Sequence, residues 1–461
     1  MPVIMRENSW PKDQRLRRWL LIVILTVCVT GAASFAGPRK NRSVIVISLD
    51  GFPAYALDDP RLPIPTIRKL AHDGVIATSM RPVNPTVTWP NHTAIVTGVN
   101  ASEHHVLFNG LLVRQDAAVP TVEPWRDKEQ LVHAPTIYDV AYQEGLTTAQ
   151  VDWVAIYGAK TITWQFPELP DLNGEIEREL INAGFVTSDQ LRKFEDSSQA
   201  WQDEIWTAAT VDIIEKHKPN LLLFHLLTLD DINHTYGPMT PASFTAMAFL
   251  DAKVKQVVDA VKRSHRLKRT TFIILSDHGF RGYEYKIRPN ELLKERGIVK
   301  GQDGQSKSDV WVMPEGGSAG VYILNRNRTS ELLPELRKIF STAEGVARIY
   351  DPNEFAALGY PLPSATDQAP DLVLAAATDY MFSGESEGPY VEFARGGTHG
   401  YINTDPQMQA IFIASGAGIQ KGIRIGSISN LDVAPTIAEL LGLSMKSASG
   451  RPIPGLPSEG E

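Results

Sequence analysis

The run Val44-Ile-Val-Ile-Ser-Leu-Asp50-Gly51 constrains the fold more than any other part of this 461-residue chain. Residues 44–49 are apolar and mostly β-branched apart from Ser48, which is typical of a parallel strand buried on both faces. Asp50 and Gly51 then end the strand with a carboxylate and a turn. Because ligands of open α/β sheets bind at the carboxyl ends of the strands, Asp50 is a candidate site residue.

Other segments extend this pattern into a sheet covered by helices. Residues 221–226, 271–275 and 409–414 are predicted strands, and apolar residues at helical spacing predict helices over 241–262 and 432–442. We therefore expect an α/β fold with a mostly parallel central sheet and helices on both faces. The stretch 282–396 separates the third predicted strand from the fourth, and its Gly-rich polar pieces predict a smaller cap inserted over the sheet edge.

The segment 84–92, Asn-Pro-Thr-Val-Thr-Trp-Pro-Asn-His, places a hydroxyl in a constrained setting. Its prolines predict that no regular helix runs through Thr88, and Asn91 is expected to cap a helix that begins near Thr93. Thr88 would then lie on a turn before a helix N-terminus, where backbone N–H groups favour an anion. With a carboxylate nearby, this setting predicts a nucleophile that acts on phosphate.

The N-terminal 36 residues have the features of an export segment. Basic residues at 15–18 precede the uncharged stretch 19–36, which ends in Ser-Phe-Ala, with small residues where a signal peptidase cleaves. We predict a cleaved signal peptide at 1–36 in preference to an uncleaved membrane anchor at 19–36, because the stretch is short for a membrane span. Either reading predicts a periplasmic or extracellular body, and a membrane contact only if the segment is uncleaved.

Net charge and cysteine count limit which partners and which metal ligands are expected. The formal net charge of −8 argues against nonspecific nucleic-acid binding, which depends on basic surface. Cys28 is the only cysteine and lies in the export segment, so the body has no intrachain disulfide and its metal sites must use histidines and carboxylates.

Six candidate metal ligands follow predicted strands or lie in a Gly-bounded loop: Asp50, Asp230, His234, Asp277, His278 and His399. Strand ends of this kind face one edge of a sheet, so these side chains can converge. Asp230 and His234 are four residues apart and share one face of a helical turn. Carboxylates combined with imidazoles suit zinc, with manganese or iron as weaker alternatives.

Together, these motifs resemble the alkaline phosphatase superfamily and, within it, the type I phosphodiesterase/nucleotide pyrophosphatase family. The matching motifs are Asp50-Gly, Pro85-x-x-Thr88-x-Pro-Asn-His92, Asp230-x-x-x-His234-x-x-Gly-Pro, Ser276-Asp277-His278-Gly279 and Thr398-His399-Gly400. The resemblance runs from about residue 44 to 453 and implies an alkaline phosphatase-like catalytic domain over 40–455.

The resemblance also implies a two-zinc site and the roles of its residues. One zinc would be held by Asp230, His234 and His399, and the other by Asp50, Asp277, His278 and the Thr88 oxygen. Asn109 matches the family asparagine that hydrogen-bonds the phosphoryl oxygens. The implied activity is hydrolysis of phosphodiester or pyrophosphate bonds in a small phosphorylated substrate, such as a nucleotide, through a phospho-threonine intermediate.

One match and two departures bear on the substrate. Trp89 keeps the aromatic residue that follows the nucleophile in nucleotide-specific members and would line the substrate site, but His225 replaces a tyrosine and Thr228-Leu229 replaces Glu-Pro. The Asp-Ile-Asn-His wording resembles the phosphonoacetate hydrolases, so a phosphonate hydrolase or phosphomonoesterase on the same two metals is an alternative. A non-catalytic envelope protein is a second alternative.

Overall fold

The computed structural model describes residues 37–114, 119–299, 308–385 and 387–456. The described residues from 38 onward form one compact unit. The predicted export signal or anchor at 1–36 lies outside the described residues. Within the described part of the chain, no helix is both long enough and apolar enough to cross a membrane.

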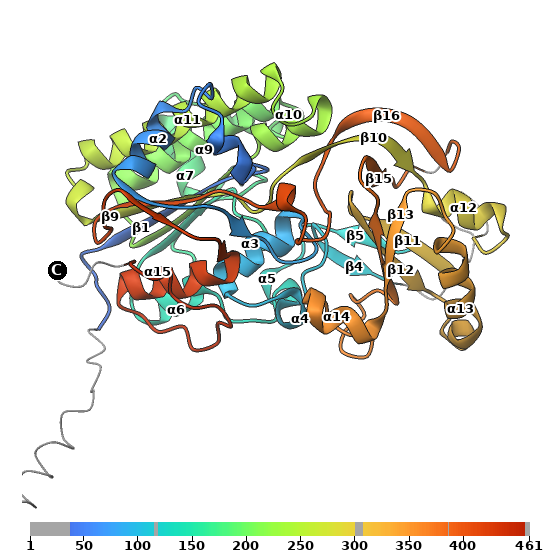
Figure 1. The fold of residues 1–461 in the computed structure, drawn as a ribbon. Coiled ribbons are helices and arrows are strands. Elements are labelled where there is room, and N and C mark those ends of the chain that lie inside the picture. The colour runs from blue at the N-terminus through green and yellow to red at the C-terminus, as the bar shows by residue number, and fades with distance from the viewer. Residues whose placement is uncertain (1–36, 115–118, 300–307, 386, 457–461) are drawn as a thin grey trace, which may run out of the picture. The chain divides into compact units, whose positions relative to one another are not determined.

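An eight-stranded sheet forms the centre of this unit (Figure 1). Its order is β18 (Ile423–Ile425), β2 (Gly74–Ala77), β17 (Phe412–Gly416), β9 (Thr270–Leu275), β1 (Ser43–Leu49), β8 (Leu221–Leu226), β6 (Thr148–Val151) and β7 (Trp164–Phe166). All neighbouring pairs are parallel except those made by β17, which runs antiparallel to β9 and β2. The predicted mostly parallel sheet is confirmed.

Helices cover both faces of the sheet, which explains why β1 is apolar at all positions except Ser43 and Ser48. Ile45 and Ile47 pack on one face with α2 (Pro65–His72), α7 (Glu175–Asn182), α9 (Gln199–Asp212) and α11 (Pro241–Arg263). Val44 and Val46 pack on the other face with α3 (Thr88–Thr97), α6 (Ile137–Gln143) and α15 (Val433–Leu441). Successive side chains of a strand point to opposite faces, so burial on both faces requires apolar residues at both parities.

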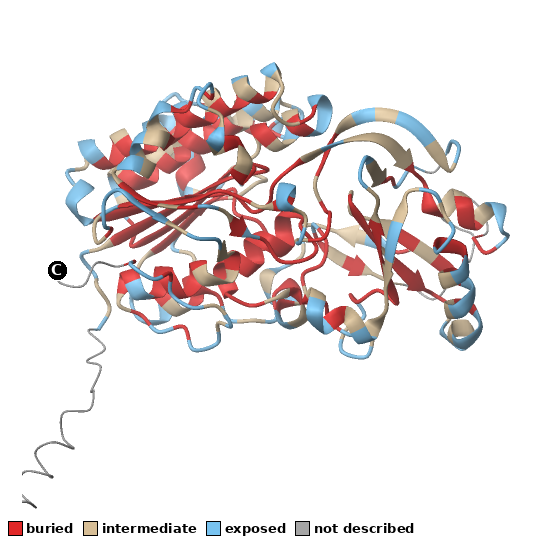
Figure 2. Cartoon of the chain, viewed as in Figure 1, coloured by how far each residue is buried: buried red, intermediate tan, exposed pale blue. Residues whose placement is uncertain are grey.

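The chain between β9 and β17 forms two smaller sheets with a core of their own (Figure 2). One contains β10 (Arg281–Ile287), β15 (Tyr380–Phe382) and β16 (Val391–Thr398); the other contains β11 (Val310–Pro314), β12 (Ser318–Ile323), β13 (Val346–Tyr350) and β14 (Leu372–Ala376). Helices α12 (Pro289–Glu295) and α13 (Thr329–Phe340) pack beside them. We propose that this part is the inserted cap.

Helix α3 begins earlier than the sequence predicts. It starts at Thr88, with Val87 as its N-cap, so the nucleophile candidate is the first helical residue and does not lie on a turn before the helix. Pro90 is tolerated because the first-turn N–H groups of a helix have no intrahelical acceptor to lose. Asn91 lies inside the helix and donates to the carbonyls of Pro85 and Val87, each at 2.9 Å, so it fixes the segment that enters the helix.

Candidate metal centre and adjoining pocket

The carboxyl ends of β1, β8 and β9 bring three aspartates to one place. Asp50 directly follows β1, and Asp277 lies two residues beyond the end of β9. Helix α10 (Thr228–Tyr236) begins two residues after β8, so Asp230 lies in its first turn and His234 one turn later. His234 Nε2 is 3.3 Å from Asp230 Oδ2, as the four-residue spacing predicts.

His399 reaches the same edge because β17 is antiparallel to its neighbours. An antiparallel strand starts where the parallel strands end, so the loop that leads into β17 passes the carboxyl edge of the sheet. His399 Nε2 lies 3.9 Å from Asp230 Oδ1. Ligand atoms of Asp230, His234 and His399 all lie within 4.8 Å of one another, which makes them a candidate metal-binding group.

A second candidate group lies beside the first and shares Asp230. Ligand atoms of Asp50, Asp230 and His278 also lie within 4.8 Å of one another. His278 Nε2 is 3.4 Å from Asp50 Oδ1 and 3.2 Å from Asp277 Oδ2. The structure therefore brings all six predicted ligands together, and Asp230 lies between the two groups.

The three imidazoles are held in the orientation that metal ligands need. Each Nδ1 faces a backbone carbonyl: His234 faces Gly397 at 3.2 Å, His278 faces Gly279 at 3.1 Å and His399 faces Thr86 at 3.1 Å. Because a carbonyl only accepts, each Nδ1 carries the hydrogen, and Nε2 of the neutral ring keeps a lone pair. Metal-binding histidines are commonly fixed by such hydrogen bonds from the other ring nitrogen.

Buried carboxylate oxygens at the centre make no hydrogen bond with the described residues: Asp50 Oδ1, Asp230 Oδ1 and Asp277 Oδ2. Burial, together with the charges of Asp277 and Asp230, raises the pKa of Asp50. Burial lowers the pKa of His278 to about 4 and that of His399 to about 3, so both rings are neutral at pH 7. Crowded carboxylates with unpaired oxygens and neutral imidazoles fit a divalent cation, which would neutralise the charge that burial disfavours.

The nucleophile candidate lies against this centre. Thr88 Oγ1 is 3.5 Å from His278 Nε2. The Oδ1 of Asn109 accepts a hydrogen bond from Trp89 N at 3.0 Å, so its amide N–H groups remain as donors beside Thr88. Asn109, His234 and His399 line a cavity of about 440 Å³ whose other wall comes from residues of 283–286, 314–316 and 381–385.

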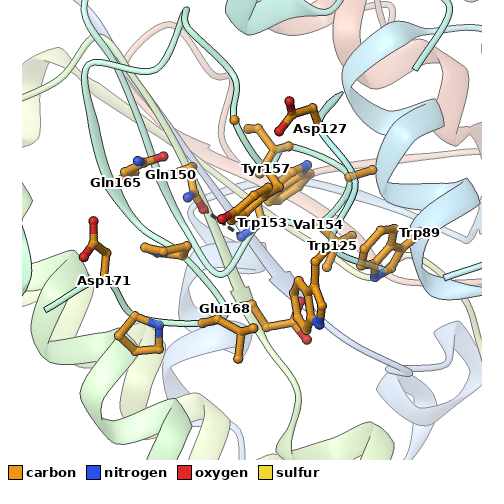
Figure 3. Close-up of a pocket in the computed structure, with 16 residues that line it drawn as sticks. Trp89, Trp125, Asp127, Gln150, Trp153, Val154, Tyr157, Gln165, Glu168 and Asp171 are labelled. Atoms are coloured by element: carbon orange, nitrogen blue, oxygen red, sulfur yellow. Dashed lines mark hydrogen bonds between the residues drawn. The ribbon is translucent and has the colours of Figure 1, made fainter. Parts of the chain in front are cut away.

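A second pocket, of about 640 Å³, contains the residue that follows Thr88 (Figure 3). Its aromatic lining is Trp89, Trp125, Trp153 and Tyr157, and its charged lining among the described residues is acidic: Asp127, Glu168 and Asp171. Only Trp89 was predicted from the sequence. The other lining residues lie mainly in segments 125–127 and 153–171, which are irregular apart from β7 and carry no motif or periodic pattern.

His225 stands where nucleotide-specific family members carry a tyrosine, but it lines neither of the two pockets described above. It is fully buried near the end of β8, and its Nε2 lies 2.9 Å from Asp50 Oδ2. Burial by itself would lower the pKa of His225, but the hydrogen bonds and charges of Asp152 and Asp50 outweigh it and raise the pKa. The sequence marked this residue only as a departure from a family pattern.

Comparison with known proteins agrees with this geometry. A family model described as type I phosphodiesterase / nucleotide pyrophosphatase matches residues 44–402. The chain is 25% identical over 436 residues to an uncharacterized pyrophosphatase/phosphodiesterase of Schizosaccharomyces pombe, with 88% of this chain and 78% of that protein covered. It is 24% identical over 457 residues to the venom phosphodiesterase of Macrovipera lebetinus, covering 96% of this chain but 47% of that protein.

Two further relatives belong to mammals. The human ectonucleotide pyrophosphatase/phosphodiesterase family member 1 is 25% identical over 421 residues, and this chain spans 40% of its length. The solved structure of murine ectonucleotide pyrophosphatase/phosphodiesterase 5 superposes with a TM-score of 0.68 at 18% identity, covering 89% of this chain and 97% of that one. At that identity, the superposition shows a shared fold.

Proposed function

The chain belongs to the type I phosphodiesterase/nucleotide pyrophosphatase family, and on that premise we propose that it is a zinc-dependent hydrolase of phosphodiester or pyrophosphate bonds with Thr88 as its nucleophile. One observation carries the proposal. Thr88 Oγ1 lies 3.5 Å from His278 Nε2, at the edge of two adjoining groups of metal-binding residues. The Thr88 hydroxyl therefore lies where the nucleophile of a two-metal hydrolase must lie.

The residues divide into two sets of ligands. Asp50, Asp277 and His278 would hold one zinc beside Thr88, and Asp230, His234 and His399 would hold the other. Zinc suits these carboxylate and imidazole donors, with manganese or iron as alternatives. When bound, the two ions supply Lewis acidity that lowers the pKa of a hydroxyl and stabilises charge on the leaving oxygen.

The residues of the chain then have distinct tasks in two steps. In the first, Thr88 Oγ loses its proton and bonds to phosphorus, while the bond from phosphorus to the leaving oxygen breaks and that oxygen takes up a proton. In the second, water loses a proton and bonds to the same phosphorus, while the Thr88 Oγ–phosphorus bond breaks and Thr88 Oγ takes up a proton. We assign the contact with the non-bridging oxygens to the Asn109 amide, because Trp89 N–H already donates to Asn109 and Pro90 has no N–H.

The pocket around Trp89 supports a substrate with a flat or apolar group next to the phosphate. Aromatic faces suit nucleobases, which stack on them. An inactive variant of the murine relative was solved in complex with AMP. Because His225 is bound to Asp50, a second aromatic surface would come from Trp125 or Tyr157, and we propose nucleotides as the first substrates to test.

The charge of the cavity supports a diester over the phosphonate or phosphomonoester alternative. A dianionic group needs more positive charge around it than a diester does. Among the described residues lining the cavity, Lys286 is the only lysine or arginine, and its Nζ is paired with Glu385 Oε1 at 2.7 Å. Glu315 adds a carboxyl to the same lining.

We also propose that the protein is exported. It rests on the sequence of residues 1–36 and on the venom and ectonucleotide names of the relatives. Small phosphorylated compounds outside the cytoplasm are the partners this location implies. Nucleic acid is not among the expected partners, because the chain carries a net charge of −8.

The activity is tested with purified residues 37–461, before and after chelation and after return of zinc. Bis-p-nitrophenyl phosphate, p-nitrophenyl phosphate, ATP and phosphonoacetate are compared at equal concentration. We expect zinc-dependent turnover that favours the diester or ATP. Preference for the monoester or phosphonoacetate would replace the proposed substrate class, and absence of turnover of all four with zinc bound would support the non-catalytic alternative.

A further inference from the structure

We propose that His225 is a positioning residue that orients the metal ligand Asp50 through a buried hydrogen-bonded chain from Asp152, and thereby sets the zinc affinity of the site next to Thr88. The inference rests on the proposed function only in requiring a metal at that site.

The first evidence is how the ring of His225 is held. Its Nε2 lies 2.9 Å from Asp50 Oδ2, and its Nδ1 lies 3.1 Å from the backbone carbonyl of Asp152 and 3.3 Å from Asp152 Oδ2. Carbonyl and carboxylate oxygens accept hydrogen bonds, so both ring nitrogens donate. The ring is therefore fixed at both ends, and it fixes Asp50 in turn.

The second evidence is the division of labour between the two oxygens of Asp50. His225 holds Oδ2, whereas Oδ1 is buried, makes no hydrogen bond with the described residues and lies 3.4 Å from His278 Nε2. One oxygen is thus held by the protein and the other is presented to the metal site. Partners of this kind fix the orientation of a metal ligand and are important for affinity.

The third evidence is that Asp152 has no other evident task. It is a non-glycine residue in the left-handed region, with φ at 56°, a conformation that is unfavourable for an L side chain. The Asp152 carboxylate is buried, and neither of its oxygens has a hydrogen-bond partner among the described residues. The His225 ring, 3.3 Å from Oδ2, is therefore the ion-pair partner that compensates for the burial of this carboxylate.

The surrounding packing keeps the ring in place. The ring of His92 lies against His225 with centroids 4.3 Å apart, and His92 Nδ1 donates to the carbonyl of Thr88 at 2.9 Å. His92 Nε2 is 2.9 Å from Ser48 Oγ, which donates to it. His225 therefore lies in a packed layer between Asp50 and the start of the nucleophile helix, where a shift of the ring would displace a metal ligand.

The two candidate metal groups make the inference testable inside one protein. Asp50 belongs to the group with His278 but not to the group of Asp230, His234 and His399. If His225 had a purely structural role, its replacement would lower the zinc affinity of both groups equally or would lower only the stability of the fold. If His225 positions Asp50, its replacement lowers the affinity for one zinc ion and leaves the affinity for the other unchanged.

The experiment is zinc titration of the metal-free full chain against a competing chelator, for wild type, His225→Leu, His225→Gln and a control. We expect His225→Leu to weaken the binding of one of the two zinc ions by about 10–100-fold and to leave the affinity for the other unchanged. His225→Gln, whose amide nitrogen can take the place of Nε2, should recover much of the loss. His104→Gln is the control, because His104 is equally buried and belongs to neither group.

Each outcome decides the matter. Wild-type affinity for both ions in His225→Leu, or equal loss of both, overturns the inference. If His225→Leu does not fold, His225→Asn, whose amide is too short to reach Asp50 Oδ2, is titrated in its place, and unchanged affinity for both ions overturns the inference in that variant. A wild-type chain that binds no zinc would instead contradict the metal requirement of the proposed function.

Discussion

Replacement of Gly51 by alanine should disturb both the fold and the metal centre. Gly51 has a φ of +67°, and a Cβ there would lie 2.9 Å from Phe280 Cδ2 and 3.1 Å from Asp230 Oδ1. The left-handed conformation costs a non-glycine residue about 1–2 kcal/mol. Overpacking against the buried ring adds about 1–3 kcal/mol. We therefore expect Gly51→Ala to lower the free energy of unfolding by about 2–5 kcal/mol, the sum of these two costs.

Gly184→Ala is the matched control for that variant. Gly184 has a φ of +75°, but a Cβ there meets no atom within 4 Å, so it carries only the conformational cost. Urea unfolding of the chelated proteins, followed by tryptophan fluorescence, gives the difference between the two variants. That difference should be about 1–3 kcal/mol, and equal destabilisation of both would refute the clash and the crowding of Asp230 that it implies.

Three further predictions concern the nucleophile, the pocket and the acid response. Thr88→Ala should lower diester hydrolysis by about a thousandfold or more while leaving the zinc content unchanged, and equal turnover would remove Thr88 from the mechanism. Trp89→Ala should raise KM for ATP by the loss of about 1–3 kcal/mol of stacking, and an unchanged KM for ATP would place Trp89 outside the base site. Burial lowers the pKa of His104 to about 3, so the folded chain binds fewer protons than the unfolded chain below pH 6.5 and stability falls as the pH drops through that window. His104→Gln should therefore lose about 1.4 kcal/mol less per pH unit between pH 6.5 and 3 in urea unfolding, and an unchanged pH slope would contradict the lowered pKa.

The sequence predicted the parts of the site that depend on local pattern. A strand buried on both faces is mostly apolar, and the residues just after it lie at the edge where parallel strands end, which located Asp50 and Asp277. The spacing of Asp230 and His234 required only that one helical turn begin there, and α10 supplies it.

Other parts depend on contacts that no local pattern records. The start of α3 was predicted too late because prolines were read as helix breakers, although a first-turn proline loses no intrahelical hydrogen bond. The antiparallel direction of β17, which brings His399 to the centre, depends on sheet pairing. The link from His225 to Asp152 joins residues 73 apart in the sequence, so only the fold reveals it.

The central claim is that Thr88 forms a covalent bond to phosphorus at the metal centre. Acid quench during turnover of bis-p-nitrophenyl phosphate, followed by peptide mass spectrometry, tests it most directly. We predict a p-nitrophenyl phosphoryl group on the peptide that contains Thr88, present with zinc and absent after chelation. Continued zinc-dependent turnover with no modified Thr88, or with the group on another residue, would contradict the account.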